Sequence, residues 1–184
     1  EMIEQARARA AELAPRLAGV VEFAVGDITA LDEPDGGWNK VVVTRVVINL
    51  GDWENQRRAL RECARVVAPG GLLLLSEATI QGWERLNGFR AEWGLEPIPM
   101  PPFNTYLDQD AVCQELAGDM DLLELRNFAS SYYVGSRVLK PLLARALGSG
   151  VDVAEPEMEW NRWFSMLPAG GDYGTQKLFV FKKR

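Results

Sequence analysis

Two short aliphatic runs on either side of a helical segment constrain this chain most. Residues Lys40–Val47 (KVVVTRVV) are β-branched and almost unbroken, and Leu72–Ser76 (LLLLS) is equally apolar. Such runs are typical of strands that are covered on both faces. Between them, Asp52 can cap a helix that ends at Pro69-Gly70-Gly71. A strand, a helix and a second strand in this order predict a parallel sheet with helices on its faces.

The rest of the chain adds further elements to this unit. Apolar residues spaced by three and four predict a first helix from Ile3 that ends near residues 15–19, and Val20–Val25 should follow as a strand. The buried side of the helix after Asp52 should consist of Ala59, Leu60, Cys63, Ala64, Val66 and Val67. In the second half, helices are expected over Gln81–Trp93, over Ala111–Leu116, which Asp108 can cap, and over Ser136–Leu147. A rigid proline-rich loop should follow the first of these helices, over Gly94–Phe103. Strands are expected over Leu122–Phe128 and Gly174–Phe181.

Composition excludes several classes of protein. The 184 residues suggest one domain, and 47% hydrophobic with 25% charged residues is ordinary for a soluble globular protein. The net charge of −6, with no Lys/Arg-rich block, disfavours nucleic-acid binding. No apolar run approaches the roughly 18 residues of a membrane span, and no secretory signal is visible. Without histidine, the chain cannot form His-based triads or HExxH zinc sites. Cys63 and Cys113 indicate free thiols in a reducing, cytoplasmic setting, not a disulfide or metal site.

Polar residues follow three of the predicted strands. They are Gly26-Asp27-Ile28, Thr44-Arg45 and Ser76-Glu77. Ligands bind outside the carboxyl ends of the strands in an open parallel sheet, so these residues predict a ligand crevice. On its own, Asp27 could cap a turn, bind a metal, act as a base or hold a ligand. The lack of histidine and of clustered cysteines weakens the metal hypothesis.

Three segments in sequence order carry a family resemblance. EFAVGDITAL, KVVVTRVVINL and ALRECARVVAPGGLLLLSE resemble the central part of a class I S-adenosylmethionine-dependent methyltransferase. The resemblance implies an α/β, Rossmann-like three-layer sandwich, in which a mostly parallel sheet has helices on both faces and an antiparallel last strand. It covers residues 1–77 clearly and Gly174–Phe181 more loosely. It therefore implies one partial domain over residues 1–184, with the cofactor side in residues 1–77 and the acceptor side in residues 78–184.

The resemblance also implies a role for each polar strand end. The position of Asp27 corresponds to an acidic residue that hydrogen-bonds the adenine amino group, and that of Ile28 to an apolar contact with the ring. Thr44, Arg45 and Val46 would line the methionine side of S-adenosyl-L-methionine and the acceptor pocket. Arg45 could equally be structural or face the acceptor. Glu77 would border the acceptor as the candidate catalytic residue, either as a general base or, as we favour, by orienting a hydroxyl group.

Further candidates for acceptor binding lie in the second half of the chain. Loops that cover sites often determine specificity, which points to the residues around the proline-rich loop. These are Trp83, Asn87, Asn104 and Tyr106. Tyr132, Tyr133 and Arg137 could form a lid over the acceptor or pack as core, and Trp160, Trp163 and Phe164 pose the same choice. The core interpretation is the commoner one for aromatic residues in such runs.

The sequence departs from the family pattern at its beginning. The glycine-rich loop and the ribose-binding acidic residue are absent, and both would precede Glu1. We therefore expect the 184 residues alone to bind cofactor poorly and to expose sheet edges. The predicted function is methyl transfer to a small-molecule acceptor, a sugar or another hydroxyl compound, in a bacterial protein. A non-catalytic Rossmann-like scaffold is the alternative. A nicotinamide-dependent dehydrogenase is disfavoured, because no Tyr-x-x-x-Lys or histidine catalytic set occurs. The sequence gives no indication of the oligomeric state.

Overall fold

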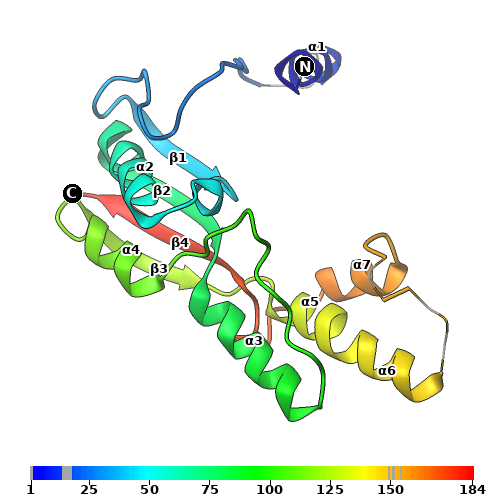
Figure 1. Cartoon of the computed structure of the whole chain (residues 1–184). Coiled ribbons are helices and arrows are strands. Elements are labelled where there is room, and N and C mark those ends of the chain that lie inside the picture. The colour runs from blue at the N-terminus through cyan, green and yellow to red at the C-terminus, as the bar shows by residue number, and fades with distance from the viewer. Residues whose placement is uncertain (1, 14–17, 149, 151, 154) are drawn as a thin grey trace.

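The computed structural model contains a four-stranded sheet in the order β1-β2-β4-β3 (Figure 1). It describes residues 2–13, 18–148, 150, 152–153 and 155–184. The strands are β1 (Trp38–Thr44), β2 (Val67–Ala78), β3 (Met120–Arg126) and β4 (Gln176–Lys183). β1 and β2 are parallel, and β4 runs antiparallel to both of its neighbours, β2 and β3. The predicted α/β, Rossmann-like class with an antiparallel last strand is confirmed.

The helices are distributed unevenly around this sheet. They are α1 (Met2–Leu13), α2 (Trp53–Val66), α3 (Ile80–Glu92), α4 (Gln109–Leu116), α5 (Ser130–Val134), α6 (Lys140–Leu147) and α7 (Glu159–Ser165), with a 3-10 turn η2 (Val47–Asn49) and a π-helical turn η3 (Gly135–Leu139). Helices α2 and α4 lie side by side on one face of the sheet, α5 to α7 gather beyond the end of β3, and α1 lies apart from the sheet (Figure 1). On the opposite face, Leu74 and Val180 are only partly buried and Val42 is 66% exposed.

The core lies between α2, α4 and the sheet face that they cover. Asp52 caps α2 as predicted, because its side chain accepts a hydrogen bond from the Asn55 backbone N–H at 2.9 Å. The six residues predicted to form the buried side of α2 are all buried. Four of them, Leu60, Cys63, Ala64 and Val67, pack in one cluster with the sheet residues Val43, Leu73, Leu75, Phe179 and Phe181. Each large apolar side chain buried in this way contributes about 1.5–3 kcal/mol.

The two cysteines are expected to differ in reactivity. Cys63 is buried on α2, and desolvation raises its pKa to about 12, whereas Cys113 on α4 is only partly buried. Because the thiolate is the reactive species, iodoacetamide at pH 8 should leave Cys63 unmodified in the folded protein and alkylate Cys113 slowly. Mass spectrometry of tryptic peptides measures the extent of alkylation at each cysteine. Protein unfolded in guanidinium is the control, in which both cysteines should react. Rapid alkylation of Cys63 under native conditions would contradict its place in the core.

The structure corrects the prediction for the first elements. Residues Val20–Val25 form an extended segment but no strand, and Val20 and Val25 are 88% and 89% exposed. The alternating pattern needs a neighbouring strand to pair with, and no described strand lies beside it: β1 pairs only with β2 within the described sheet. The apolar stripe of α1 is likewise unburied. The predicted end of the first helix, with Pro15 and Leu17, falls partly on residues 14–17, outside the described residues.

Other element boundaries also differ from the prediction. β1 ends at Thr44 and not at Val47, because Arg45 adopts a left-handed backbone conformation with φ 55°. α2 ends at Val66, and Pro69-Gly70-Gly71 lies in the irregular first part of β2, where Gly70 has φ 76°. The helix predicted from Ser136 begins at Ser130 and passes through η3 before α6. The predictions for α3, α4, β3, β4 and the proline-rich loop hold to within a few residues.

Candidate functional site

The carboxyl ends of β1 and β2 and the start of β4 meet at one edge of the sheet. The backbone N–H of Arg45 donates to the Ser76 carbonyl oxygen at 3.0 Å. The Gln176 side-chain amide donates to the same carbonyl at 3.0 Å and to the Ser76 hydroxyl at 3.1 Å. The polar ends of these two parallel strands therefore lie together, as the sequence predicted, and Gln176 joins them from the antiparallel strand.

Glu77 holds the turn that follows β1. Its Oε1 accepts hydrogen bonds from the backbone N–H groups of Val46 at 2.8 Å and Val47 at 2.9 Å. The side chain is completely buried, and Oε2 has no hydrogen-bond partner within the described part of the chain. Burial raises the pKa of this carboxyl group, and the backbone bonds oppose that shift. The carboxylate therefore braces the Arg45–Asn49 turn and presents no oxygen to solvent.

A second segment, residues 103–107, is hydrogen-bonded to the same turn. The Asn49 side chain donates to the Arg45 carbonyl oxygen at 2.7 Å, and Asn104 donates to the Asn49 side chain at 2.6 Å. The Thr105 backbone N–H donates to the Ile48 carbonyl oxygen at 2.8 Å. Asn104, predicted as an acceptor residue beside the proline-rich loop, therefore lies next to the turn that follows β1. Through its hydrogen bond to Asn49, it stabilises the turn that carries Arg45.

Tyr106 follows Thr105 in the segment that is hydrogen-bonded to the Arg45 turn, and Tyr133 influences it electrostatically. Tyr106 is partly buried against the core cluster, where burial raises the pKa of its hydroxyl, Tyr133 raises it further and Arg45 lowers it. Tyr133, on α5, is partly buried and stacks edge-on against Tyr132 with ring centroids 5.8 Å apart. Tyr106 therefore belongs to a distant segment that is hydrogen-bonded to the turn carrying Arg45.

Asp27 forms a turn at the end of the extended segment. Its Oδ1 accepts from the Thr29 backbone N–H at 2.8 Å and from the Thr29 hydroxyl at 2.7 Å, and these bonds lower its pKa. The turn-capping interpretation is therefore realised. Oδ2 takes part in no hydrogen bond of the described residues, and Ile28 next to it packs against the core. The ionised carboxylate keeps one oxygen for a ligand donor.

The other predicted acceptor residues make structural contacts. The Trp83 indole N–H donates to the Ile98 carbonyl oxygen at 2.8 Å, and the Asn87 side chain bonds the same residue, so both tie the proline-rich loop to α3. Arg137 is partly buried on η3, and its carbonyl oxygen accepts from the Arg90 guanidinium. In the aromatic segment, Phe164 is buried, Trp163 is 54% exposed, and the Trp160 indole donates to the Gly135 carbonyl oxygen at 2.9 Å.

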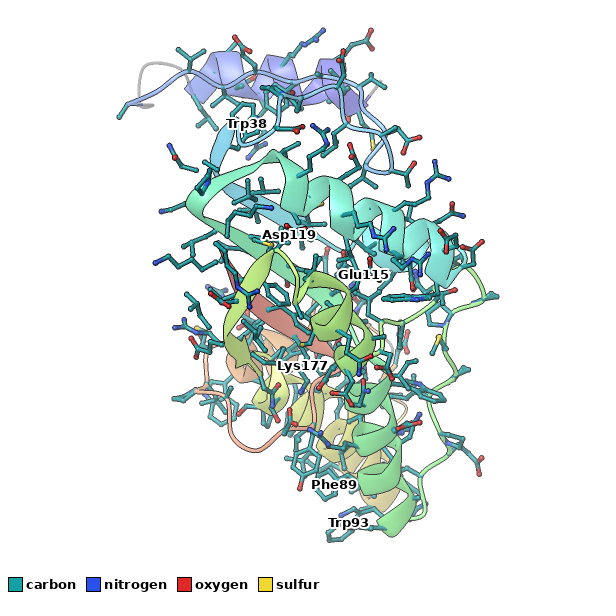
Figure 2. The ribbon with its side chains drawn as sticks, turned by 90° about the vertical axis from the view of Figure 1, so that its left-hand side faces the viewer. Trp38, Phe89, Trp93, Glu115, Asp119 and Lys177 are labelled. Carbon is teal, nitrogen blue, oxygen red and sulfur yellow. The ribbon has the colours of Figure 1, made fainter. Side chains whose placement is uncertain are left out.

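Sequence reasoning missed a charge cluster near the same edge, in which a buried lysine contacts partly exposed partners. Lys177 lies on β4 with 1% of its side chain exposed, and its ammonium group contacts Asp172, which also contacts Arg85 on α3. Burial and the nearby Arg85 lower the Lys177 pKa to about 8. Figure 2 labels Lys177 on β4 and Phe89 on α3. A lysine inside the apolar run QKLFVF was the available signal.

Open cavities occur elsewhere. One of about 660 Å³ lies between α1 and Gly19–Phe23, and one of about 350 Å³ is lined by Phe89, Phe164 and Tyr173 among others. Neither includes Asp27, Arg45 or Glu77. In the described ranges, no three Cys, Asp or Glu side chains are grouped to hold a metal ion, and no helix has the length and apolar character needed to cross a bilayer.

Sequence comparison identifies one family over part of the chain. Residues 1–71 match the family model described as a methyltransferase domain. No curated protein matches the chain in sequence. The match covers the turn at Asp27, β1 with the turn at Arg45, α2 and the first residues of β2. It does not extend to Glu77 or to the tyrosines.

Several solved structures share the fold, one of them a SAM-dependent methyltransferase. The PH0226 protein from Pyrococcus horikoshii OT3 has a TM-score of 0.57 at 15% identity, covering 100% of this chain and 67% of that one. A SAM-dependent methyltransferase from Methanosarcina mazei has a TM-score of 0.52 at 15% identity, covering 95% and 76%. The [4+2]-cyclase SpnF has a TM-score of 0.55 at 18% identity, covering 98% and 62%. At these identities the likeness shows the fold alone, and the cyclase illustrates that one fold can carry different chemistry.

Proposed function

We propose that the chain belongs to an S-adenosylmethionine-dependent methyltransferase that methylates a small-molecule hydroxyl compound, such as a sugar. The observation that carries the proposal is the convergence of Arg45, Tyr106 and Gln176 at the carboxyl edge of the sheet. The net charge of −6 supports a small acceptor over a nucleic acid. Free thiols at Cys63 and Cys113 support a cytoplasmic setting, and the sequence resemblance supports a bacterial origin.

The residues at Asp27 fit the adenine end of the cofactor. The free Oδ2 of an ionised Asp27 can accept a hydrogen bond from an amino group, and the partly buried Ile28 offers an apolar surface. When bound, S-adenosylmethionine supplies a methyl group that is already activated on a sulfonium. The chain therefore has to position the acceptor more than to activate the donor.

On the acceptor side we propose that Glu77 is a positioning residue. Its Oε1 is occupied by two backbone N–H groups and its side chain is completely buried, so it acts on the acceptor through the Arg45 turn. Thr44 and Val46 flank Arg45 on that turn and are exposed, which suits contacts with the methionine side of the cofactor. We propose that Tyr106, which follows Thr105 in the segment hydrogen-bonded to this turn, orients the acceptor hydroxyl.

Replacing Asp27 with alanine tests the cofactor site. In the full-length protein, D27A should weaken binding of S-adenosylhomocysteine by about 1–3 kcal/mol in calorimetric titration, because one polar contact with the adenine is lost. D32A, which removes an exposed carboxylate five positions further along the same loop, is the control and should bind normally. Equal affinities of D27A, D32A and the wild type would show that Asp27 only caps its turn. No binding by any of the three would favour the non-catalytic scaffold.

A further inference from the structure

The cavity of about 350 Å³ lies between α3, α5 and the segment that leads from α7 to β4. Its lining is mostly apolar, and the side chains responsible are Phe89, Val134, Phe164, Leu167 and Tyr173. Small-molecule sites in proteins occupy about 300–1,000 Å³ and are lined mainly by apolar and aromatic side chains. A cavity of about 150 Å³ in another protein already holds benzene, so this one has room for two fused rings.

Two aromatic walls line this cavity. Phe89 on α3 stacks on Tyr173, with ring centroids 4.7 Å apart and an angle of 29° between the ring planes. Phe164 is buried beside Gly135, where a β-carbon would overlap its ring, and Trp163 meets it edge-on with centroids 4.9 Å apart. Gly135 begins the π-helical turn η3, a distortion that frequently lies at functional sites. Packing therefore fixes both walls, and their rings favour a flat aromatic partner.

Hydrogen bonds hold the Gly170 to Tyr173 side of the cavity in place. The Ser130 hydroxyl donates to the Gly170 carbonyl oxygen at 2.7 Å and accepts from the Tyr173 backbone N–H at 3.0 Å. The Asn127 side chain donates to the Gly171 carbonyl oxygen at 2.7 Å. A wall that is ordered before a ligand arrives lowers the entropic cost of binding.

The same segment leads to the carboxyl edge of the sheet. Tyr173 precedes Gln176 by three residues, and the Gln176 side chain bonds Ser76 at the end of β2. Three residues span at most about 11 Å, so one molecule of that length can occupy both the cavity and the strand edge. We infer that the cavity binds an aromatic ring of the acceptor, so that the acceptor is a hydroxyl compound carrying a flat aromatic group. This inference rests on the proposed function and names the chemical class of its substrate.

Two matched probes test the inference without cofactor. 2-Naphthol titrated into the full chain should shift the backbone NMR resonances of Ser131, Gly170 and Gly171. Decahydro-2-naphthol has the same carbon skeleton without the flat rings and should bind about three- to tenfold more weakly. F89A removes one of the stacked rings and should lower 2-naphthol affinity about tenfold. W93A is the control: it removes an exposed aromatic ring just beyond the end of the same helix, outside the cavity lining, and should leave affinity unchanged (Figure 2).

A second comparison tests whether the ring belongs to the acceptor. With S-adenosylmethionine, the full-length protein should methylate 2-naphthyl glucoside with a kcat/KM at least about tenfold above that for methyl glucoside, because only the former can fill the cavity. Equal values would overturn the assignment of the ring to the acceptor.

Three outcomes of the titration would overturn the inference. These are equal binding of 2-naphthol and decahydro-2-naphthol, equal loss of affinity in F89A and W93A, and resonance shifts that map away from Gly170 and Gly171. If F89A loses its native circular dichroism, F89L replaces it: an apolar side chain stays but the flat ring is lost, so the preference for 2-naphthol should fall. Because the titration contains no cofactor, its failure leaves methyl transfer to other hydroxyl compounds open. Failure of S-adenosylhomocysteine to bind would count against the proposed function instead.

Discussion

Replacing Glu77 with alanine should lower the free energy of unfolding by about 3 kcal/mol, measured by urea denaturation. The change removes a completely buried side chain and leaves the backbone N–H groups of Val46 and Val47 without their acceptor. Buried donors that lose their acceptor incur the full cost of desolvation. The Arg45 turn should loosen as well, so amide hydrogen exchange at Val46 and Val47 should accelerate more than the loss of global stability explains.

E77Q is the matched control, because glutamine keeps an oxygen that can accept both N–H groups. We expect E77Q to retain most of the stability that E77A loses. Since burial raises the Glu77 pKa above 4.5, the folded state holds its proton more tightly than the unfolded state. The stability that the wild-type carboxyl group contributes is therefore full at low pH and is lost as pH rises through the folded pKa. The stability of E77Q relative to the wild type should consequently increase with pH. Equal stabilities of E77A and E77Q at all pH values would contradict the bracing role.

Replacing Gly82 with alanine should lower the free energy of unfolding by about 2–3 kcal/mol. A β-carbon there would overlap the Gly174 carbonyl oxygen and lie 2.9 Å from the Thr175 Cα. Both obstacles are backbone atoms, so α3 would have to move away from the segment that leads into β4. In that segment, the Thr175 carbonyl oxygen also accepts a hydrogen bond at 2.9 Å from the backbone N–H of Thr79, the residue directly before α3.

Gly88 in the same helix provides the comparison. Nothing lies within 4 Å of the β-carbon it would carry. G88A should therefore stabilise the protein by about 0.5–1 kcal/mol, through the better helix propensity of alanine. Opposite signs for G82A and G88A in thermal denaturation would confirm close packing of α3 on the Gly174-Thr175 backbone. Equal effects would show that helix propensity alone governs both positions.

The sequence predicted best those elements whose partners lie nearby in the chain. α2, with its Asp52 cap and its buried side, and the central strands β1 and β2 follow from local apolar patterns. Val20–Val25 has the same alternation but forms no strand, because pairing depends on a neighbour that periodicity cannot reveal. The early end of β1 depends on the left-handed conformation of Arg45, which an arginine does not suggest as a glycine or asparagine would.

The site could be predicted only in outline. The polar ends of β1 and β2 were found because strand ends are recognisable, and Asn104 and Tyr106 because they border a proline-rich loop. The role of Glu77 could not be read from the sequence, since it depends on two backbone N–H groups of another strand end. Gln176 and Lys177 were missed because an antiparallel strand brings them to the site from the far end of the chain.

The attachment of the proline-rich loop to α3 joins two neighbouring segments of the chain into one unit. Trp83, Asn87 and Arg90 on α3 all bond the backbone of the loop, at Ile98 and Glu96. Helix and loop should therefore move as one rigid wall. The helices α5 to α7 pack mainly on one another beyond β3 (Figure 1). Because Arg90 also donates to the Arg137 carbonyl oxygen, and Arg145 on α6 to that of Gly94, we expect this three-helix unit to move together with the wall.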